Sequence, residues 1–249
     1  MVVNFHLIRR RAAFAVASVL IAGVTLACKS IPDGAAGPDA DALAAKMLAA
    51  VNYEAWENKT AAVSWTFRGD RKHFWDKRRG LVEVQWSGFI ARFDKNTLQG
   101  VVFKDGVRLT EPAEVRKQLA QANAYFVNDA FWLNPLFHIR SPGTQFSTVG
   151  ANSLKVVFAS GGVTPGDTYV FHVDESGLVQ SMQLWVSVLP VKGASAVFEN
   201  YAVSETGVKT ALKYDFLVTV EIGDVRMYPA YPDKKGDEDR FSDLAGLAN

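Results

Sequence analysis

The spacing of hydrophobic residues changes along the chain and predicts where helices give way to strands. From Asp39 to about Trp56, apolar residues recur every three or four positions, which predicts an amphipathic helix. From Thr60 onward the apolar residues alternate with polar ones, as in half-buried strands of an antiparallel sheet. The clearest alternating faces are Val63, Trp65 and Phe67; Val82, Val84 and Trp86; Leu154, Val156 and Phe158; and Tyr169, Phe171 and Val173.

Short turn sequences separate these strands. Asp105-Gly106, Glu175-Ser176-Gly177 and Thr206-Gly207 each supply the glycine that a positive φ requires. Nine to eleven strands in meander order are expected, and a sheet of that size tends to curl or to close. The sequence therefore predicts one large and strongly curved sheet.

The middle of the chain interrupts the strand pattern. Glu111 to Tyr125 is expected to be helical, with Pro112 in the first turn. The segment from Phe126 to Ile139 is too aromatic for a free loop and predicts a short helix and a lid over the open side of the sheet. Within it, Asn128 and Asp129 have two interpretations: a cap at the start of a short helix, or the polar mouth of an apolar cavity.

The N-terminus has the pattern of an export signal. Arg9, Arg10 and Arg11 precede an apolar run that stops at Cys28, the only cysteine of the chain. A lone cysteine at this place resembles the lipidated cysteine of bacterial lipoproteins, although Thr25-Leu26-Ala27 departs from the usual preceding tripeptide. The alternatives are a plain signal peptide and an uncleaved anchor, but a run of about 16 residues is shorter than the ~20 that span a bilayer.

The chain therefore divides into four expected parts. These are a signal peptide (1–27), a flexible tether (28–38), a folded domain (39–230) and a mobile, charged tail (231–249). We expect export and a lipid anchor at Cys28. By resemblance to lipoprotein sorting signals, Lys29 after the cysteine favours the periplasmic face of the outer membrane.

Charge and composition exclude several functions. The full chain carries a net charge of +1, and without the three signal arginines the charge is 24 − 26 = −2. No basic patch indicates nucleic-acid binding, and a single cysteine excludes an intrachain disulfide and cysteine-rich zinc sites. Aromatic residues make up 12% of the chain, including six Trp and 16 Phe, so a large core or a lined cavity is needed.

Four segments carry a resemblance to a known family. They are Trp65–Gly69, the run Asn128-Asp129-x-Phe131-Trp132-Leu133, Pro142-Gly143, and Asp167–Asp174. With the order of elements, they resemble the lipoprotein carriers and receptors of the Lol pathway (LolA/LolB-like), and an uncharacterised secreted group of that fold. The resemblance covers roughly residues 40 to 225.

The resemblance implies an α+β, mainly β fold: a large curved antiparallel sheet that forms an unclosed β-barrel, with helices covering the concave face. It implies a cavity for acyl chains. The functional arginine of the carriers matches no single position here, and Arg68, Arg71 and Arg92 are all candidates.

Motifs for catalysis are absent from the sequence: it contains no G-x-S-x-G, P-loop, G-x-G-x-x-G or H-E-x-x-H. His73, His138 and His172 are scattered, and a hydrolase using one of them is the weakest of the hypotheses. His172 and Asp174 share one strand face, as a solvated pair or as a metal or acid–base pair. We expect no enzyme activity, no cofactor and no metal.

The expected function is that of a cell-envelope lipoprotein that holds a lipid, acyl chain or other apolar molecule in a half-barrel. The sequence leaves open whether an envelope protein is a further partner. The alternative is a structural or interaction lipoprotein whose core is filled by its own side chains. The candidate ligand-binding residues, each of which could instead serve core packing, are Trp65, Phe67, Trp86, Asn128, Asp129, Phe131, Trp132 and Phe137.

Overall fold

Thirteen strands form one antiparallel sheet in the computed structural model, which describes residues 29–159, 166–187, 191–232 and 239–245. The strand order is β6-β5-β4-β3-β2-β1-β13-β12-β11-β10-β9-β8-β7. The end strands β6 and β7 do not pair, so the barrel is open. The expected fold class is confirmed, with more strands than the nine to eleven predicted.

The strands follow the alternating segments of the sequence. Their bounds are β1 Ala62–Phe67, β2 Arg71–Asp76, β3 Leu81–Trp86, β4 Phe89–Asp94, β5 Gly100–Lys104, β6 Val107–Arg108, β7 Thr144–Thr148, β8 Ser153–Phe158, β9 Thr168–Val173, β10 Val179–Trp185, β11 Ala194–Val203, β12 Lys209–Asp215 and β13 Val220–Tyr228.

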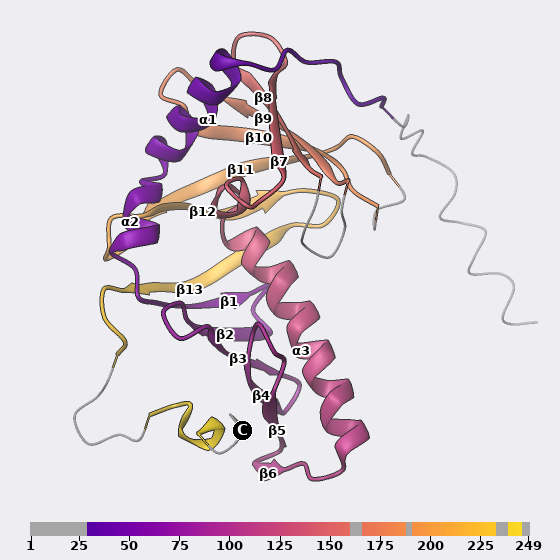
Figure 1. Ribbon diagram of the computed structural model, residues 1–249, viewed down its shortest axis with the longest axis vertical. Helices are drawn as coiled ribbons and strands as arrows, with labels where there is room; N and C mark the ends of the chain where they lie inside the picture. Colours follow the sequence, from indigo (N-terminus) through magenta and orange to yellow (C-terminus); the bar gives the residue numbers. More distant parts are fainter. Residues whose placement is uncertain (1–28, 160–165, 188–190, 233–238, 246–249) are drawn as a thin grey trace, which may run out of the picture.

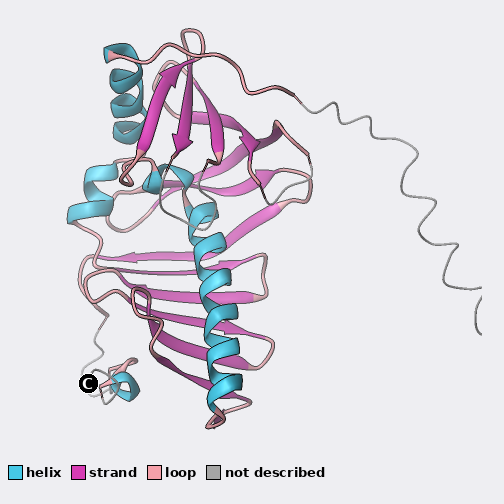
Figure 2. Cartoon of the chain, turned by 45° about the vertical axis from the view of Figure 1, so that its right-hand side comes forward, coloured by secondary structure: helices cyan, strands magenta, loops and turns pink. Residues whose placement is uncertain are grey.

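The sheet has two wings with helices on its concave side (Figure 1). Strands β1–β6 form the first wing, and β7–β12 form the second, with β13 between them. Helix α3 (Pro112–Leu133) crosses the strands of the first wing and reaches the second (Figure 2). Helix α1 (Pro38–Ala50) packs against β7 and β8 of the second wing.

The predicted helix over residues 39–56 is instead two helices. Helix α1 ends at Ala50, and α2 (Tyr53–Asn58) begins after Asn52, which has a left-handed backbone with φ of 55°. Asparagine tolerates this conformation better than most residues, and its side chain donates to the carbonyl of Gly207 at 3.0 Å. The chain turns at Asn52 so that α2 lies where the two wings meet.

Helix α3 continues through the segment predicted as a separate lid. Glu111 caps it by accepting hydrogen bonds from the N–H groups of Ala113 and Glu114, and Pro112 occupies the first turn. The helix does not end at Tyr125 but runs to Leu133, followed by a short 3₁₀ helix, Pro135–His138. The lid is therefore one long helix because no residue after Tyr125 breaks it.

Strand pairing is sparse where the two wings join. Strands β12 and β13 pair only at Lys213 with Glu221 and at Tyr214 with Val220. Beyond these pairs the C-terminal end of α3 lies against β12: the Thr210 hydroxyl donates to the carbonyl of Leu133. The α3 terminus thus supplies hydrogen bonds where the second strand partner is missing.

The expected flexible tether lies against the second wing in its described part, residues 29–37. Ala35 pairs with Thr148, and the Trp185 indole donates to the carbonyl of Lys29 at 2.7 Å. These contacts hold the segment, which corrects the expectation of a free linker. The signal peptide and Cys28 lie outside the described residues.

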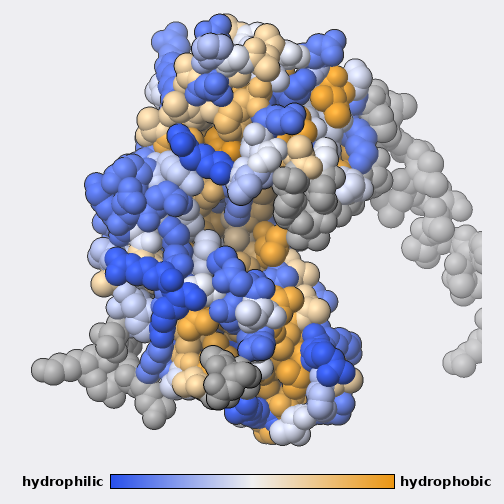
Figure 3. Space-filling model, in the orientation of Figure 1, coloured by the Kyte–Doolittle hydropathy of each residue, from blue (hydrophilic) through white to orange (hydrophobic). Residues whose placement is uncertain are grey.

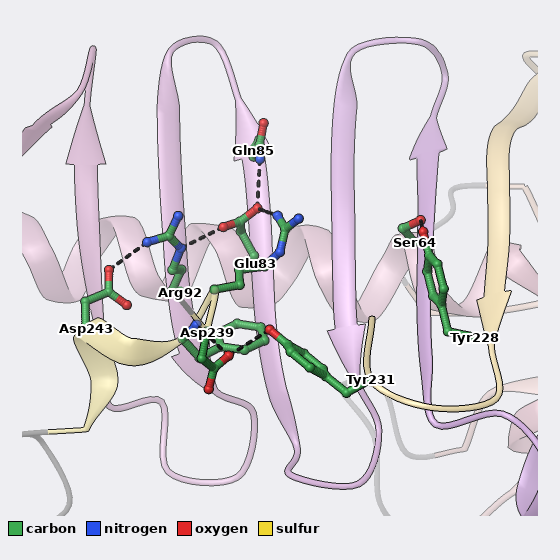
Figure 4. Close-up of polar contacts among 10 residues, drawn as sticks. Ser64, Glu83, Gln85, Arg92, Tyr228, Tyr231, Asp239 and Asp243 are labelled. Atoms are coloured by element: carbon green, nitrogen blue, oxygen red, sulfur yellow. Dashed lines mark hydrogen bonds and ion pairs between the residues drawn. The ribbon is translucent and has the colours of Figure 1, made fainter. Parts of the chain in front are cut away.

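The expected mobile tail is likewise packed where it is described. Residues 239–245, with the 3₁₀ turn Ser242–Leu244, cover the outer face of the first wing (Figure 4). Phe241 and Leu244 are buried in a second core cluster with Phe74 and Val101. The many charges of the tail hide this apolar pair in the sequence, and burial of the pair is the reason that the segment docks.

Ion pairs surround that apolar contact. Glu83 on β3 is 1% exposed and accepts from Arg92 at 2.6 Å and from Arg240 of the tail. Arg92 also donates to Asp243 at 2.7 Å (Figure 4). Residues 239–245 therefore pack as part of the domain, beyond its expected end at residue 230.

Candidate functional site

The buried side of α3 is apolar except at Gln118, whose side chain donates to Glu114 of the same helix, and at Asp129. The α3 residues that face the sheet are Leu119, Ala122, Phe126, Ala130 and Leu133, all buried. Asp129 lies on the same buried side and is fully enclosed. A carboxylate in the middle of an apolar interface is costly unless it is paired, so its partners define the candidate site.

Four donors surround the Asp129 carboxylate. Arg71 Nε donates to Oδ2 at 2.7 Å and Arg71 Nη2 donates to Oδ1 at 2.9 Å. His73 Nε2 lies 2.7 Å from Oδ2, and Asn128 Nδ2 donates to Oδ1 at 2.8 Å. The Arg71 contact is bidentate, which fixes both the angle and the position of α3 on the sheet.

Strand β2 places the two partners on the concave face. Arg71 and His73 are two residues apart, so their side chains point to the same side of the strand. His73 is paired opposite Trp65 on β1 and stacks on its ring with centroids 4.5 Å apart. The Arg71 guanidinium lies over the rings of Phe67 and Tyr125, 4.7 and 4.6 Å from their centroids.

The charges of this group follow from its burial. Burial would raise the pKa of Asp129, but hydrogen bonds from His73 and Arg71 outweigh it and hold the pKa below its ordinary value. Burial lowers the pKa of His73, and the neighbouring Asp129 only partly opposes this. The result is an ionised Asp129, a charged Arg71 and a neutral His73. Because the carboxylate only accepts, His73 donates from Nε2.

Three buried polar atoms beside this group have no hydrogen-bond partner in the described structure. They are His73 Nδ1 and the indole Nε1 atoms of Trp65 and Trp75. Trp65 and Trp75 both contact Phe126 of α3, with ring centroids 6.3 and 5.3 Å apart. Buried polar groups are usually satisfied, so a cluster of unsatisfied ones under one helix marks this interface as unusual.

The outer side of α3 is also unusual for a surface helix. Between Gln118 and Leu133 its only charged residue is the buried Asp129. Ala124 and Val127 are exposed on the outer side. Surface helices normally carry charges on the solvent side. Figure 3 shows hydrophobic residues at the surface of the lower half of the molecule, where α3 crosses the first wing.

The predicted ligand-binding residues fall into separate groups. Trp65, Phe67, Asn128 and Asp129 meet around Arg71 and His73. Asn128 is exposed and Asp129 is buried, and neither caps a short helix, because both lie inside α3. The cap interpretation is therefore wrong.

Of the remaining predicted residues, Phe131 and Trp132 lie on α3, and Trp86 of β3 packs against it. Trp86 contacts Tyr125, with ring centroids 5.7 Å apart. Phe131 meets Tyr169 of the second wing at 5.2 Å, and Trp132 meets Tyr214 at 5.1 Å.

Phe137 lies just beyond α3 and stacks on Trp56 at 3.9 Å. All the predicted aromatic residues are thus in the core, where they pack against other aromatic side chains of the protein.

A cavity of about 370 Å³ lies elsewhere, where β1, β12 and β13 meet. Its lining includes Thr66, Lys72, Lys213, Glu221 and Asp224, so it is largely polar. None of the predicted ligand-binding residues lines it. It is therefore not the apolar cavity that the sequence led us to expect.

The other histidines form no further site. His172 Nδ1 contacts the Ser153 hydroxyl at 2.8 Å, whereas Asp174 binds the turn at Ser176. His138 is near the Ala130 carbonyl, and burial lowers its pKa. Within the described ranges no cluster of three or more His, Cys, Asp or Glu could hold a metal, and no helix has the length and hydropathy to span a bilayer.

Sequence analysis did not connect Arg71 and His73 to Asp129. Two signals were present. Asp129 occupies a position in the apolar stripe of α3, three residues after Phe126 and four before Leu133. Arg71, His73 and Trp75 share one face of a strand. Each signal implies a buried polar group, but nothing in the sequence shows that the two groups meet.

No protein-family model matches the chain, and no curated protein matches it in sequence. Solved structures that are similar to it include the following two. One is a DUF1329 family protein from Desulfovibrio piger ATCC 29098, with 8% identity and a TM-score of 0.40, over 82% of this chain and 97% of that one. The other is a domain described as an outer membrane lipoprotein-sorting protein, from Vibrio parahaemolyticus, with 11% identity and a TM-score of 0.34, over 80% and 96%.

The second of these structures is described as a lipoprotein-sorting domain, which is the class that the sequence resemblance named. Similarity at these identities and TM-scores supports no conclusion about the family or the role of this chain. The function proposed next rests on this chain's own residues.

Proposed function

We propose that this protein is a non-enzymatic protein of the bacterial cell envelope that binds a lipid, an acyl chain or another apolar molecule between α3 and the curved sheet. Helix α3 is the cover of the site. The chain is exported and anchored through a lipid on Cys28. Its partner is the apolar ligand, and an envelope protein that delivers or receives it is a further candidate partner.

The observation that carries the proposal is the mode of attachment of α3. The helix is held on an apolar aromatic surface by one buried ion pair, between Asp129 and Arg71. A buried ion pair contributes little net stability compared with an apolar contact of the same size, but it specifies geometry. Such an interface closes in one defined position. Opening it exposes buried apolar surface, and an apolar ligand that enters the interface would offset that cost.

The surface under α3 suits an acyl chain. Trp65 and Trp75 of the sheet present large apolar faces to Phe126 of α3, and each CH₂ group removed from water contributes about 0.8 kcal/mol. A chain that entered this interface would replace the contacts that the sheet loses when α3 moves. Binding would therefore exchange one apolar partner of the sheet for another.

The N-terminal segment supports an attachment to the membrane through the second wing. Residues 29–37 lie along this wing, with Lys29 held by Trp185. A lipid on Cys28 would leave the domain beside Trp185. The anchor would then hold the second wing near the membrane and leave the first wing, with α3, free to move.

Binding is tested with residues 29–249, which include every described residue. The protein is purified without detergent, and native mass spectrometry identifies any bound lipid. The proposal expects a bound lipid or saturable uptake of an added one. Ala122→Trp should abolish uptake because Ala122 is fully buried against the sheet, and Ala124→Trp on the exposed side of α3 is the matched control.

One observation favours a second function, that of an interaction protein with a filled core. In the closed structure the concave face is occupied by the chain's own Phe126, Trp132 and Phe137, each less than a tenth exposed. If the purified protein is free of lipid and takes up none of several added lipids, this alternative replaces the proposal. The search then turns to protein partners.

A further inference from the structure

The sheet side of the Asp129 contact is held largely by the strands, although the Arg71 guanidinium also contacts Tyr125 of α3. Strand β2 is paired on both sides, with His73 opposite Trp65 on β1 and Val84 on β3. The guanidinium of Arg71 also rests on Phe67 of β1. When α3 separates from the sheet, Asp129 leaves with it, whereas Arg71 and His73 keep their positions on β2.

Separation leaves donors without an acceptor. Arg71 keeps its charge, with its Nε and Nη2 groups aimed at the place of the departed carboxylate. His73 keeps the Nε2–H donor beside it. Planar guanidinium groups bind carboxylates and phosphates in bidentate geometry, so the group that fits this place is an anion with two or more oxygens.

The position of the donors matches the shape of an amphiphile. The Arg71 side chain is 17% exposed, whereas that of His73 is fully buried. The apolar rings of Trp65 and Trp75 continue from His73 into the interface, and their indole N–H groups have no partner. A charged head at Arg71 would thus sit at the edge of the site, with an apolar chain directed inward.

We propose that Arg71 and His73 form the binding site for the anionic head of the ligand, and that Asp129 occupies this site in the closed state as a substitute carried on α3. The ligand class is an amphiphile with one acyl or alkyl chain and a carboxylate or phosphate head. The inference rests on the function proposed above and narrows it, because an apolar chain alone would leave Arg71 unpaired.

The test compares ligands that share one chain and differ in the head. Residues 29–249 are titrated, below the critical micelle concentration, with dodecanoate, dodecyl phosphate, dodecanol and dodecyltrimethylammonium, and binding is followed by tryptophan fluorescence. The two anions are expected to bind roughly ten- to a hundredfold more tightly than dodecanol, since a hydrogen bond to a charged group outweighs one between neutral groups. The cation should bind most weakly. The ranking of the two anions shows which head is preferred.

Variants show which side chain causes the preference for anionic heads. Arg71→Gln should reduce the ratio of anion to alcohol affinity to near one while dodecanol still binds, and Arg71→Lys should retain part of the ratio. Arg116→Gln, at an exposed arginine of α3, is the control for loss of a charge. Asp129→Asn removes the charged substitute and should raise the ratio of anion to dodecanol affinity. If the change only loosened α3, the affinities for the anions and for dodecanol would rise equally.

The outcomes separate the two claims. Equal affinity of wild-type protein for dodecanoate, dodecyl phosphate and dodecanol would overturn the anionic-head inference and leave the binding function standing. An anion preference that persists in a folded Arg71→Gln variant would also overturn it. If none of the four amphiphiles binds, the proposed function fails, and the inference fails with it.

Discussion

Removal of the Asp129 carboxylate tests how α3 is held. In Asp129→Ala, Arg71 and His73 lose their shared acceptor inside an otherwise apolar interface. Loss of one partner of a buried ion pair typically costs about 3–5 kcal/mol. Arg71 is 17% exposed and can recover some hydration, and His73 is neutral and loses only a hydrogen bond. The expected loss of unfolding free energy is therefore near the lower limit, about 3 kcal/mol.

Replacing both partners should restore most of that stability. Buried ion pairs are often neutral when exchanged for apolar residues of similar size, so Arg71→Met with Asp129→Leu should lie within about 1 kcal/mol of wild type. Urea unfolding followed by circular dichroism measures all three proteins. The midpoint for Asp129→Ala should fall by roughly 1–2 M at unchanged slope. Gln121→Ala, at an exposed polar residue of the same helix, should leave the midpoint unchanged.

Two results would refute this reasoning. The first is a loss below about 1 kcal/mol in Asp129→Ala, because the pair would then not hold α3 on the sheet. The second is a double variant no more stable than Asp129→Ala, because the two residues would then act independently. Hydrogen exchange of α3 in Asp129→Ala provides an independent check, since faster exchange is expected there than in α1.

Three further predictions concern other parts of the molecule. Burial holds the pKa of His73 below its usual 6.5, so the neutral form of His73 stabilises the fold above that pH, and stability falls as the pH drops from 6.5 toward the folded-state pKa. In urea unfolding at several pH values, His73→Gln should remove the part of the pH dependence that His73 causes and leave the part that buried His138 causes. Phe241→Ala should cost about 3 kcal/mol and release the tail to proteases, whereas the exposed Ser242→Ala should do neither. Asn134→Ala should lower the unfolding free energy by about 1–3 kcal/mol, because buried Asn134 donates to the Lys209 carbonyl of β12 and accepts from the N–H of Leu136.

The sequence predicts the sheet well because alternation of apolar residues is a local signal. Val63, Trp65 and Phe67 identify β1 without knowledge of its partners. The break between α1 and α2 was missed because it depends on one residue, Asn52, whose left-handed backbone is stabilised by a contact with distant Gly207. The full length of α3 was missed because aromatic residues after Tyr125 favour a helix no more than a packed loop.

The candidate site was only half predictable. Asn128 and Asp129 were identified, but as a cap or a cavity mouth, since their partners are more than 50 residues away on β2. The docked tail was missed for a similar reason. Phe241 and Leu244 are a small apolar signal within a charged run, and only the apolar outer face of the first wing, around Phe74, explains their burial.

The central claim, that α3 moves aside for an amphiphile, is tested most directly by a distance. Spin labels at Ala124→Cys on α3 and Lys72→Cys on β2, both exposed, report the separation of the helix from the sheet in residues 29–249. The account predicts a single short distance in the free protein and a longer one at saturating dodecanoate. An unchanged distance distribution at ligand saturation would contradict it, because the ligand would then bind without opening the cover.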